Sequence, residues 1–220
     1  MGGVGEERRS LPPTLTDVAA LIAALLLLAA PARAHEAAPA ASEWRARPVE
    51  GRLPIIRPAP DYTLATPDGR RVRAADFAGR IRVETFIYTR CADTCPLVSA
   101  KLARLQALLA ARGLLGRQVA LASITLDPVH DTPAVLARHA AAYKADPRGW
   151  LWLRGTPAET RRLLAAYGGV VPPGADLAHS DWIFLVDGEN RVREIYSERL
   201  FDPDAVLADI GVLTAVAHRP

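Results

Sequence analysis

The stretch Tyr88–Pro96 (YTRCADTCP) contains the only two cysteines of this 220-residue chain, Cys91 and Cys95. It follows the apolar run Ile81–Tyr88, which predicts a strand, and it precedes a Leu-rich pattern from Leu97 that is typical of a helix. A strand that leads through a dithiol loop into a helix places two sulfurs at a helix N-terminus. There the helix dipole and the free backbone N–H groups favour thiolate over thiol. The stretch therefore predicts either a redox dithiol or half of a metal site.

On both sides of this stretch, predicted strands alternate with predicted helices. Residues 61–72 predict a hairpin around the turn Thr66–Gly69, and Ala75–Gly79 predicts a short helical turn. After the dithiol we expect a helix to about Gly113, strands at 118–126, 151–153, 182–186 and 191–196, and helices at 133–145, 157–167 and 203–213. This order predicts an α/β domain with a thioredoxin-like fold over residues 61–213, with a central mixed sheet flanked by helices and an N-terminal hairpin addition.

The N-terminal segment 1–34 has the layout of an export signal. Arg8 and Arg9 precede the apolar stretch Val18–Ala30, and Ala32-Arg33-Ala34 provides the small residues at which a signal peptidase cleaves. The apolar stretch is shorter than the roughly 18–20 residues that span a bilayer, so an uncleaved membrane anchor is the second interpretation. Residues 35–60 are rich in Ala and Pro and predict a linker, and residues 214–220 predict a C-terminal tail.

Composition excludes one class of function. The net charge of +3 is spread along the chain, with only Lys101 and Lys144 as lysines, and no basic stripe with interleaved aromatic residues is present. Such a chain is not expected to bind nucleic acid.

The spacing of the two cysteines bears on their role. An exported protein with two cysteines can form a structural disulfide, but a bridge between Cys91 and Cys95 closes too small a loop to restrict the unfolded chain much. Common thioredoxin-type motifs have two intervening residues, whereas this pair has three. The wider spacing suits a metal held between thiolates, and soft thiolates select copper, so a third ligand is expected.

The third ligand has five histidine candidates. His218 lies in the tail, His139 falls within a helical pattern and is most simply a surface residue, and His130 lies between two aspartates and is most simply solvated. His35 would become the N-terminus after cleavage and could bind Cu(II) loosely. His179 directly precedes the strand at Trp182, and in a thioredoxin-like core the loop before that strand lies beside the dithiol. The residues alone leave His179 open between a ligand and a capping histidine.

Several motifs together resemble the Sco/SenC family of copper-binding assembly proteins. They are the dithiol segment Phe86–Pro96, Asp127–Pro133 after the second main strand, His179-Ser180 before Ile183–Asn190, and Thr66–Gly79 at the start of the domain. They follow in family order from about Asp61 to Leu213. The chain departs from the family pattern at Ala92, where Pro is common, and at Glu84 and Thr85, where apolar residues are expected; polar residues there would expose one strand face or alter a partner surface.

The resemblance implies that Cys91, Cys95 and His179 are copper ligands, with copper as Cu(I) or Cu(II). Asp93 and Asp127 match family positions and are interpreted as a loop cap and a strand-end turn. The implied function is a copper chaperone, a transfer protein rather than an enzyme, that delivers copper to the binuclear centre of cytochrome c oxidase subunit II or to another exported copper protein. The implied location is the bacterial periplasm, with a membrane tether through the N-terminal segment.

Two alternatives remain open at this stage. One is an exported thiol–disulfide oxidoreductase that reduces the copper-ligand cysteines of the oxidase and works with a thiol–disulfide reductant partner. The other is a thioredoxin-like redox sensor. His179 separates them from the chaperone, because a pure dithiol reductase has no need of an imidazole ligand.

Overall fold

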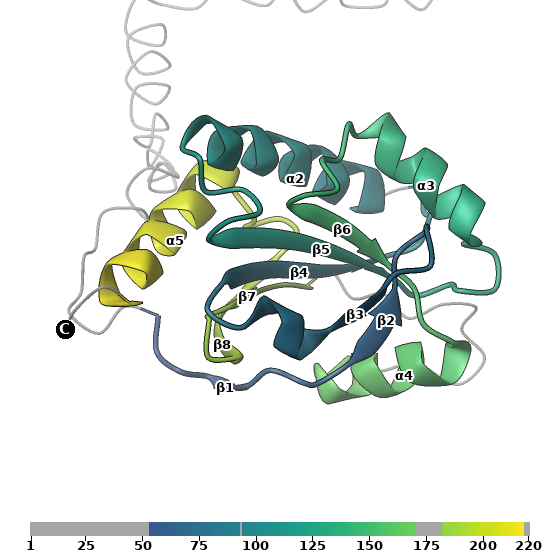
Figure 1. The fold of residues 1–220 in the computed structure, drawn as a ribbon, viewed down its shortest axis with the longest axis horizontal. Helices are drawn as coiled ribbons and strands as arrows, with labels where there is room; N and C mark the ends of the chain where they lie inside the picture. The colour runs from purple at the N-terminus through teal and green to yellow at the C-terminus, as the bar shows by residue number, and fades with distance from the viewer. Residues whose placement is uncertain (1–52, 93, 170–181, 218–220) are drawn as a thin grey trace, which may run out of the picture. The chain divides into compact units, whose positions relative to one another are not determined.

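The computed structural model describes residues 53–92, 94–169 and 182–217 (Figure 1). The strands are β1 (Arg57–Pro58), β2 (Thr63–Ala65), β3 (Arg71–Arg73), β4 (Ile81–Ile87), β5 (Val119–Thr125), β6 (Trp150–Leu153), β7 (Trp182–Val186) and β8 (Arg191–Ser197). The helices are the 3-10 helix η2 (Ala74–Phe77) and the α-helices α2 (Thr94–Ala111), α3 (Pro133–Ala142), α4 (Pro157–Ala166) and α5 (Pro203–Ala217). None of the helices in these described ranges is long and apolar enough to cross a membrane.

Six of the strands form one mixed sheet in the order β1-β8-β7-β4-β5-β6. The central strand β4 pairs in parallel with β5, which pairs in parallel with β6, whereas β7 and β8 run antiparallel. β2 and β3 form the separate hairpin that the Asp-Gly turn predicts. Because β4 and β5 are parallel, their carboxyl ends meet at one border of the sheet. The dithiol loop and the loop after β5 both begin at this border.

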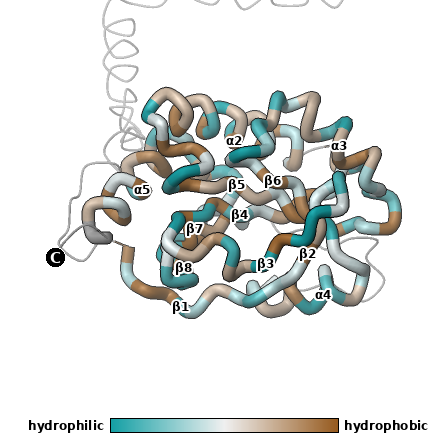
Figure 2. Tube along the Cα trace, viewed as in Figure 1, coloured by the Kyte–Doolittle hydropathy of each residue, from teal (hydrophilic) through white to brown (hydrophobic). Residues whose placement is uncertain are grey.

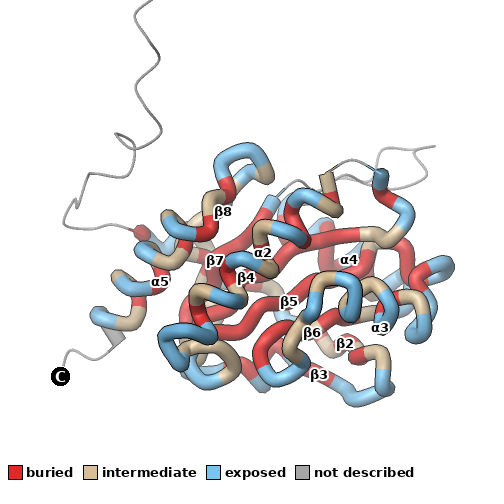
Figure 3. Tube along the Cα trace, turned by 90° about the horizontal axis from the view of Figure 1, so that it is seen from above, coloured by how far each residue is buried: buried red, intermediate tan, exposed pale blue. Residues whose placement is uncertain are grey.

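Helices cover the two faces of the sheet (Figure 1). One core cluster joins the sheet to α2, α3 and α5 and includes both cysteines with Leu102, Leu105 and Ile210. A second cluster lies on the opposite face, towards the β2–β3 hairpin, η2 and α4, and includes Phe77 and Phe184. Figure 2 shows that the strand β5 is mostly hydrophobic, and Figure 3 shows that the central strands β4 and β5 are buried, whereas β8 is only partly buried. The predicted α/β layering, central mixed sheet and N-terminal hairpin are therefore present.

Local sequence signals account for where the helices begin. The Thr132 hydroxyl accepts a hydrogen bond from the Val135 backbone N–H, and Pro133 occupies the first position of α3. Thr156 and Glu159 form a reciprocal capping box at the start of α4. Both arrangements satisfy N–H groups that the first helical turn leaves without partners. The helix after the dithiol begins at Thr94, three residues before the first leucine of its pattern, Leu97, so Cys95 lies in its first turn.

The expectation that Glu84 and Thr85 expose one face of β4 is wrong, because all seven residues of β4 are buried. The Glu84 carboxylate accepts hydrogen bonds from the hydroxyls of Tyr62 (2.5 Å) and Tyr167 and from Arg82 Nε (2.8 Å). Arg82 also donates to the side chain of Asn190 at 2.7 Å. The polar residue in the strand is thus paired inside the protein, and it links the hairpin, the end of α4 and the turn before β8.

The domain extends further at both ends than the predicted boundaries. Leu53 is buried in the core and β1 pairs with β8, although both fall in the predicted linker 35–60. At the other end α5 continues to Ala217, into the predicted tail. The predicted signal segment 1–34 lies outside the described residues, and that assignment stays a prediction.

Candidate metal centre

Cys91 and Cys95 lie where β4 leads into α2, and both are buried and not joined by a disulfide. The backbone N–H of Cys95 donates to Cys91 Sγ at 3.4 Å, and the Thr94 hydroxyl lies 3.7 Å from the same sulfur. The Cys91 N–H in turn donates to the Tyr88 carbonyl at 3.1 Å. Cys91 Sγ therefore occupies the place that an N-cap oxygen takes at other helices, and the N–H directed at it favours negative charge on the sulfur.

Cys95 behaves differently from what its place at a helix N-terminus predicts. Burial, with a further contribution from the hydrogen bond to Cys91, raises the pKa of the Cys95 thiol to about 12. The expectation of a thiolate is thus wrong for Cys95 in the metal-free protein, because desolvation outweighs the helix dipole. A metal ion that binds this sulfur has to displace a proton.

Tyr88 completes the immediate surroundings of the sulfurs. Burial raises the pKa of the Tyr88 hydroxyl to about 12, and a hydrogen bond with the Cys91 side chain acts in the same direction. The phenol therefore stays neutral throughout the physiological pH range.

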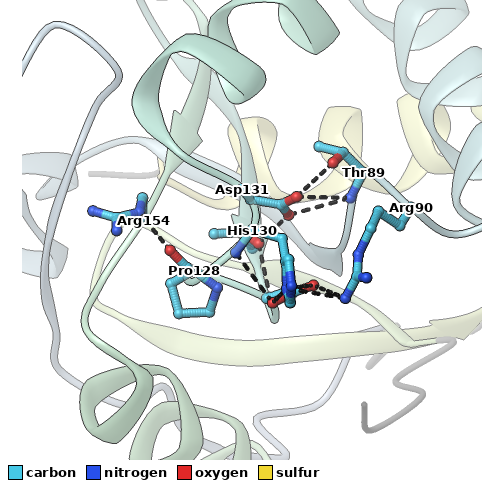
Figure 4. Close-up of polar contacts among 8 residues, drawn as sticks. Thr89, Arg90, Pro128, His130, Asp131 and Arg154 are labelled. Carbon is cyan, nitrogen blue, oxygen red and sulfur yellow. Dashed lines mark hydrogen bonds and ion pairs between the residues drawn. The ribbon is translucent and has the colours of Figure 1, made fainter. Parts of the chain in front are cut away.

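The loop between β5 and α3 holds the backbone of the dithiol loop through Asp131 (Figure 4). The buried Asp131 carboxylate accepts hydrogen bonds from the Thr89 N–H (3.2 and 3.3 Å), the Thr89 hydroxyl (2.5 Å) and the Thr125 hydroxyl (2.5 Å). Thr89 lies two residues before Cys91. Since hydrogen bonds to an ionised carboxylate are among the strong ones, Asp131 fixes the chain just before the first sulfur.

A second link in the same two loops is formed by Arg90, Asp127 and His130 (Figure 4). Asp127 accepts from Arg90 Nη2 at 2.7 Å, and His130 Nδ1 lies 2.9 Å from both carboxylate oxygens. Burial opposes ionisation of Asp127, but the hydrogen bonds from His130 and Arg90 outweigh it and lower the pKa of the carboxyl. Asp127 is therefore more than the strand-end turn that the sequence predicts. His130 is exposed, as predicted, but it has a partner.

Two of the predicted ligands are thus adjacent in space, and the third lies outside the described residues. His179 and Asp93 both fall in the undescribed positions, as do His35 and His218. Over the described ranges no group of three His, Cys, Asp or Glu side chains could hold a metal ion. The two thiols match the soft donor set that selects copper, but they need a further donor from the rest of the chain.

His139 differs from its predicted surface position. Its ring packs against Tyr143 and Trp152, with ring centroids 5.2 Å away in each case. Burial lowers the pKa of His139, and its Nε2 atom has no hydrogen-bond partner among the described residues. His139 is therefore a half-buried packing residue of α3 and not a fully exposed histidine.

The chain belongs to the SCO1/SenC family, whose model matches residues 56–215. Among curated proteins, a SCO1 protein homolog of Bacillus subtilis is 28% identical over 155 residues, which are 68% of this chain and 79% of that protein. Protein SenC of Rhodobacter capsulatus is 27% identical and is covered over 72% of each chain.

Solved structures share the fold. A SCO1/SenC family lipoprotein from Bacillus anthracis has a TM-score of 0.65 at 22% identity, covering 72% of this chain and 95% of that one. Yeast Sco1, solved with copper bound, has a TM-score of 0.62 at 23% identity, covering 72% and 89%. The α/β architecture with helices on both faces is accordingly the thioredoxin-like fold that the sequence predicts.

Proposed function

We propose that this protein is a copper chaperone that binds copper through Cys91, Cys95 and His179 and passes it to an exported copper protein. The observation that carries the proposal is the pair of buried cysteines at the start of α2, with a backbone N–H directed at the sulfur of one of them. Membership of the SCO1/SenC family supports it, since yeast Sco1 has been solved with copper bound.

The donor set explains the choice of metal. Two thiolates favour Cu(I), and an imidazole added to them also accommodates Cu(II). Because Cys95 is protonated in the metal-free chain, copper binding releases a proton and tightens as the pH rises. Three protein donors leave a coordination position through which a partner thiolate can approach.

The recipient we propose is the binuclear copper centre of cytochrome c oxidase subunit II. The support is that BsSco, a solved structure similar to this chain, is a member of the Sco family of cytochrome c oxidase assembly proteins. We further propose that the chain works outside the cytoplasm, in the periplasm, after export by residues 1–34 or while tethered by them. The lipoprotein relative from Bacillus anthracis supports such a location.

The test compares reduced wild-type protein with His179→Ala, and with His218→Ala as a control for the loss of another histidine. We expect wild type and the control to bind one Cu(II) with a thiolate-to-copper absorption band, and His179→Ala to lose that band. Cys91→Ser and Cys95→Ser should each abolish it. A His179→Ala protein whose Cu(II) titration and band match wild type would show that His179 is not the third ligand.

The second candidate function is thiol–disulfide exchange by the metal-free protein. The observation that favours it is that the two cysteines lie close together at the start of α2, where the Cys95 backbone N–H donates to Cys91 Sγ at 3.4 Å. A protein that takes up no copper after full reduction, yet rapidly reduces a model disulfide, would favour this function over copper transfer.

A further inference from the structure

Three arginines lie together at the amino ends of β4 and β5. Arg80 comes directly before β4, and Arg112 and Arg117 flank the turn between α2 and β5. Arg80 Nη1 donates to the Gly116 carbonyl at 3.4 Å, so the loops that lead into the two strands are in contact. Figure 1 shows these loops at the left ends of β4 and β5. We call Arg80, Arg112 and Arg117 the basic border.

No carboxylate of the described residues pairs with the basic border. Arg80 donates to two backbone carbonyls, and Arg112 donates to the Leu108 carbonyl at 3.1 Å. Arg117 is exposed, and its side chain has no hydrogen bond or ion pair within the described part of the chain. The border therefore presents three positive charges that are not compensated. The other charged residues around it are paired with one another: Asp187 and Glu189 with Arg191 and Arg193, Asp76 with Arg73, and Asp146 with Arg148.

The chain enters the described domain at the same end of the sheet. Arg193 donates to the Leu53 carbonyl through Nε and to the Asp187 carboxylate through Nη1, in both cases at 2.8 Å. Asp187 follows β7, which runs antiparallel to β4, so Asp187 lies beside the amino end of β4. Residues 31–52 connect Leu53 to the apolar stretch that the sequence predicts as an export signal or anchor. The domain is thus joined to that stretch at the end that carries the basic border.

The dithiol lies at the opposite end of the same strands. β4 spans the seven residues Ile81–Ile87 and is therefore about 20 Å long. Cys91 follows the carboxyl end of β4, whereas Arg80 precedes its amino end. A surface that contacts the basic border consequently leaves the dithiol on the far side of the domain, where a partner protein can reach it.

We propose that the basic border binds the anionic phospholipid headgroups of the membrane to which the N-terminal segment tethers the chain. The inference rests on the proposed tether. Each arginine near an anionic surface favours binding by about fivefold, the equivalent of about 1 kcal/mol, so three favour it by about 100-fold over a neutral bilayer. An acidic protein would also complement three positive charges. The point of chain entry favours lipid, because the tether holds this end of the domain at a high effective concentration near the bilayer.

Paramagnetic broadening in nuclear magnetic resonance of the ¹⁵N-labelled full chain measures this contact. The chain is incorporated into lipid nanodiscs with a gadolinium-chelating lipid, and the remaining lipid is either phosphatidylglycerol or phosphatidylcholine. On phosphatidylglycerol we expect the amide signals of Gly113 and Gly116 to broaden more than that of Thr89, which lies near the dithiol. On phosphatidylcholine, or in roughly 1 M salt, where the Debye length is about 3 Å, this difference should disappear.

Paired substitutions show whether charge is responsible. Arg112→Gln with Arg117→Gln should lower the binding equilibrium of the domain on phosphatidylglycerol by about 25-fold. Arg112→Lys with Arg117→Lys keeps both charges and should bind as wild type does. The matched control is Arg161→Gln with Arg162→Gln, which changes the net charge equally. Both of these arginines are exposed on α4, which follows the carboxyl end of β6 and so begins at the other end of the sheet.

The outcomes separate the tether from the lipid contact. Retention of the chain on phosphatidylcholine discs reports the tether, and the copper titrations proposed above involve no lipid. Three results would each overturn the lipid contact: broadening of Thr89 as strong as that of Gly113, the same pattern on phosphatidylcholine, or a Gln pair at Arg112 and Arg117 that binds as the control does. A chain that is retained on neither kind of disc would overturn both the tether and the lipid contact.

Discussion

The buried Glu84 carboxylate offers the sharpest test of how this fold is stabilised, and Glu84→Gln is the substitution that removes only its charge. Glu84 is fully buried and Arg82 has an exposed fraction of 1%, so the substitution leaves a buried guanidinium without its anion. Breaking a buried ion pair on one side costs about 3–5 kcal/mol. In a domain of this size, each kcal/mol lowers the melting temperature by about 2–4 °C. The expected decrease is therefore about 6–20 °C.

Urea unfolding followed by circular dichroism measures this free energy. Glu189→Gln is the matched control, since the Glu189 side chain is 62% exposed and its pair with Arg191 should contribute less than about 1 kcal/mol. The double substitution Arg82→Met with Glu84→Gln should cost less than the sum of the single substitutions, because no unpaired guanidinium remains. A loss below about 1 kcal/mol for Glu84→Gln, with an unchanged urea dependence, would refute the reasoning.

Three further predictions concern the dithiol and the turns. Alkylation of Cys95 by iodoacetamide in the metal-free protein should be slow at pH 8 and should accelerate up to about pH 12, whereas a rate already constant at pH 8 would contradict the raised pKa. Asp131→Ala removes the acceptor of the Thr89 hydroxyl, so thermal unfolding should show a loss of stability of about 2 kcal/mol, and copper binding should weaken. An unchanged copper affinity would show that Asp131 does not position the dithiol. Gly113→Ala should lower the free energy of unfolding by about 1–2 kcal/mol, because Gly113 has a positive φ of 64° and the added Cβ meets no other atom. Gly116→Ala should lower it clearly more, because the Cβ added at Gly116 would also lie 2.5 Å from a backbone carbonyl oxygen. Equal losses of the two variants in urea titrations would contradict this.

The sequence predicts most of the elements because their signals are local. Strand and helix periods, the Asp-Gly turn of the hairpin and the Thr-Pro pairs before α3 and α4 each depend on neighbouring residues, and the structure places these elements within a few residues of the prediction. The cysteine pair is equally local. Its position at the start of α2 follows from the strand before it and the helix after it.

The partners of the buried polar residues could not be predicted, since they are distant in the chain. Glu84 bonds to Tyr62 and Tyr167, which are 22 and 83 positions away. A carboxylate in an apolar strand signals that a buried partner is needed, but no local pattern says which. His139 is a comparable case: its helical position suggests an exposed residue, but Trp152 from β6, far along the chain, packs against its ring and half-buries it.

Two buried carboxylates, Glu84 and Asp131, hold different parts of this structure together. Glu84 lies in the middle of β4 and joins segments that pack on one face of the sheet, so its role is in the folding of the whole domain. Asp131 lies at the border where β4 and β5 end, and it accepts hydrogen bonds from Thr89, two residues before Cys91. The hydrogen bonds of Glu84 do not depend on what the dithiol binds, whereas those of Asp131 hold the segment that carries Cys91. Both carboxylates thus contribute to the stability of the domain, but of the two only Asp131 also holds the segment that presents a thiol.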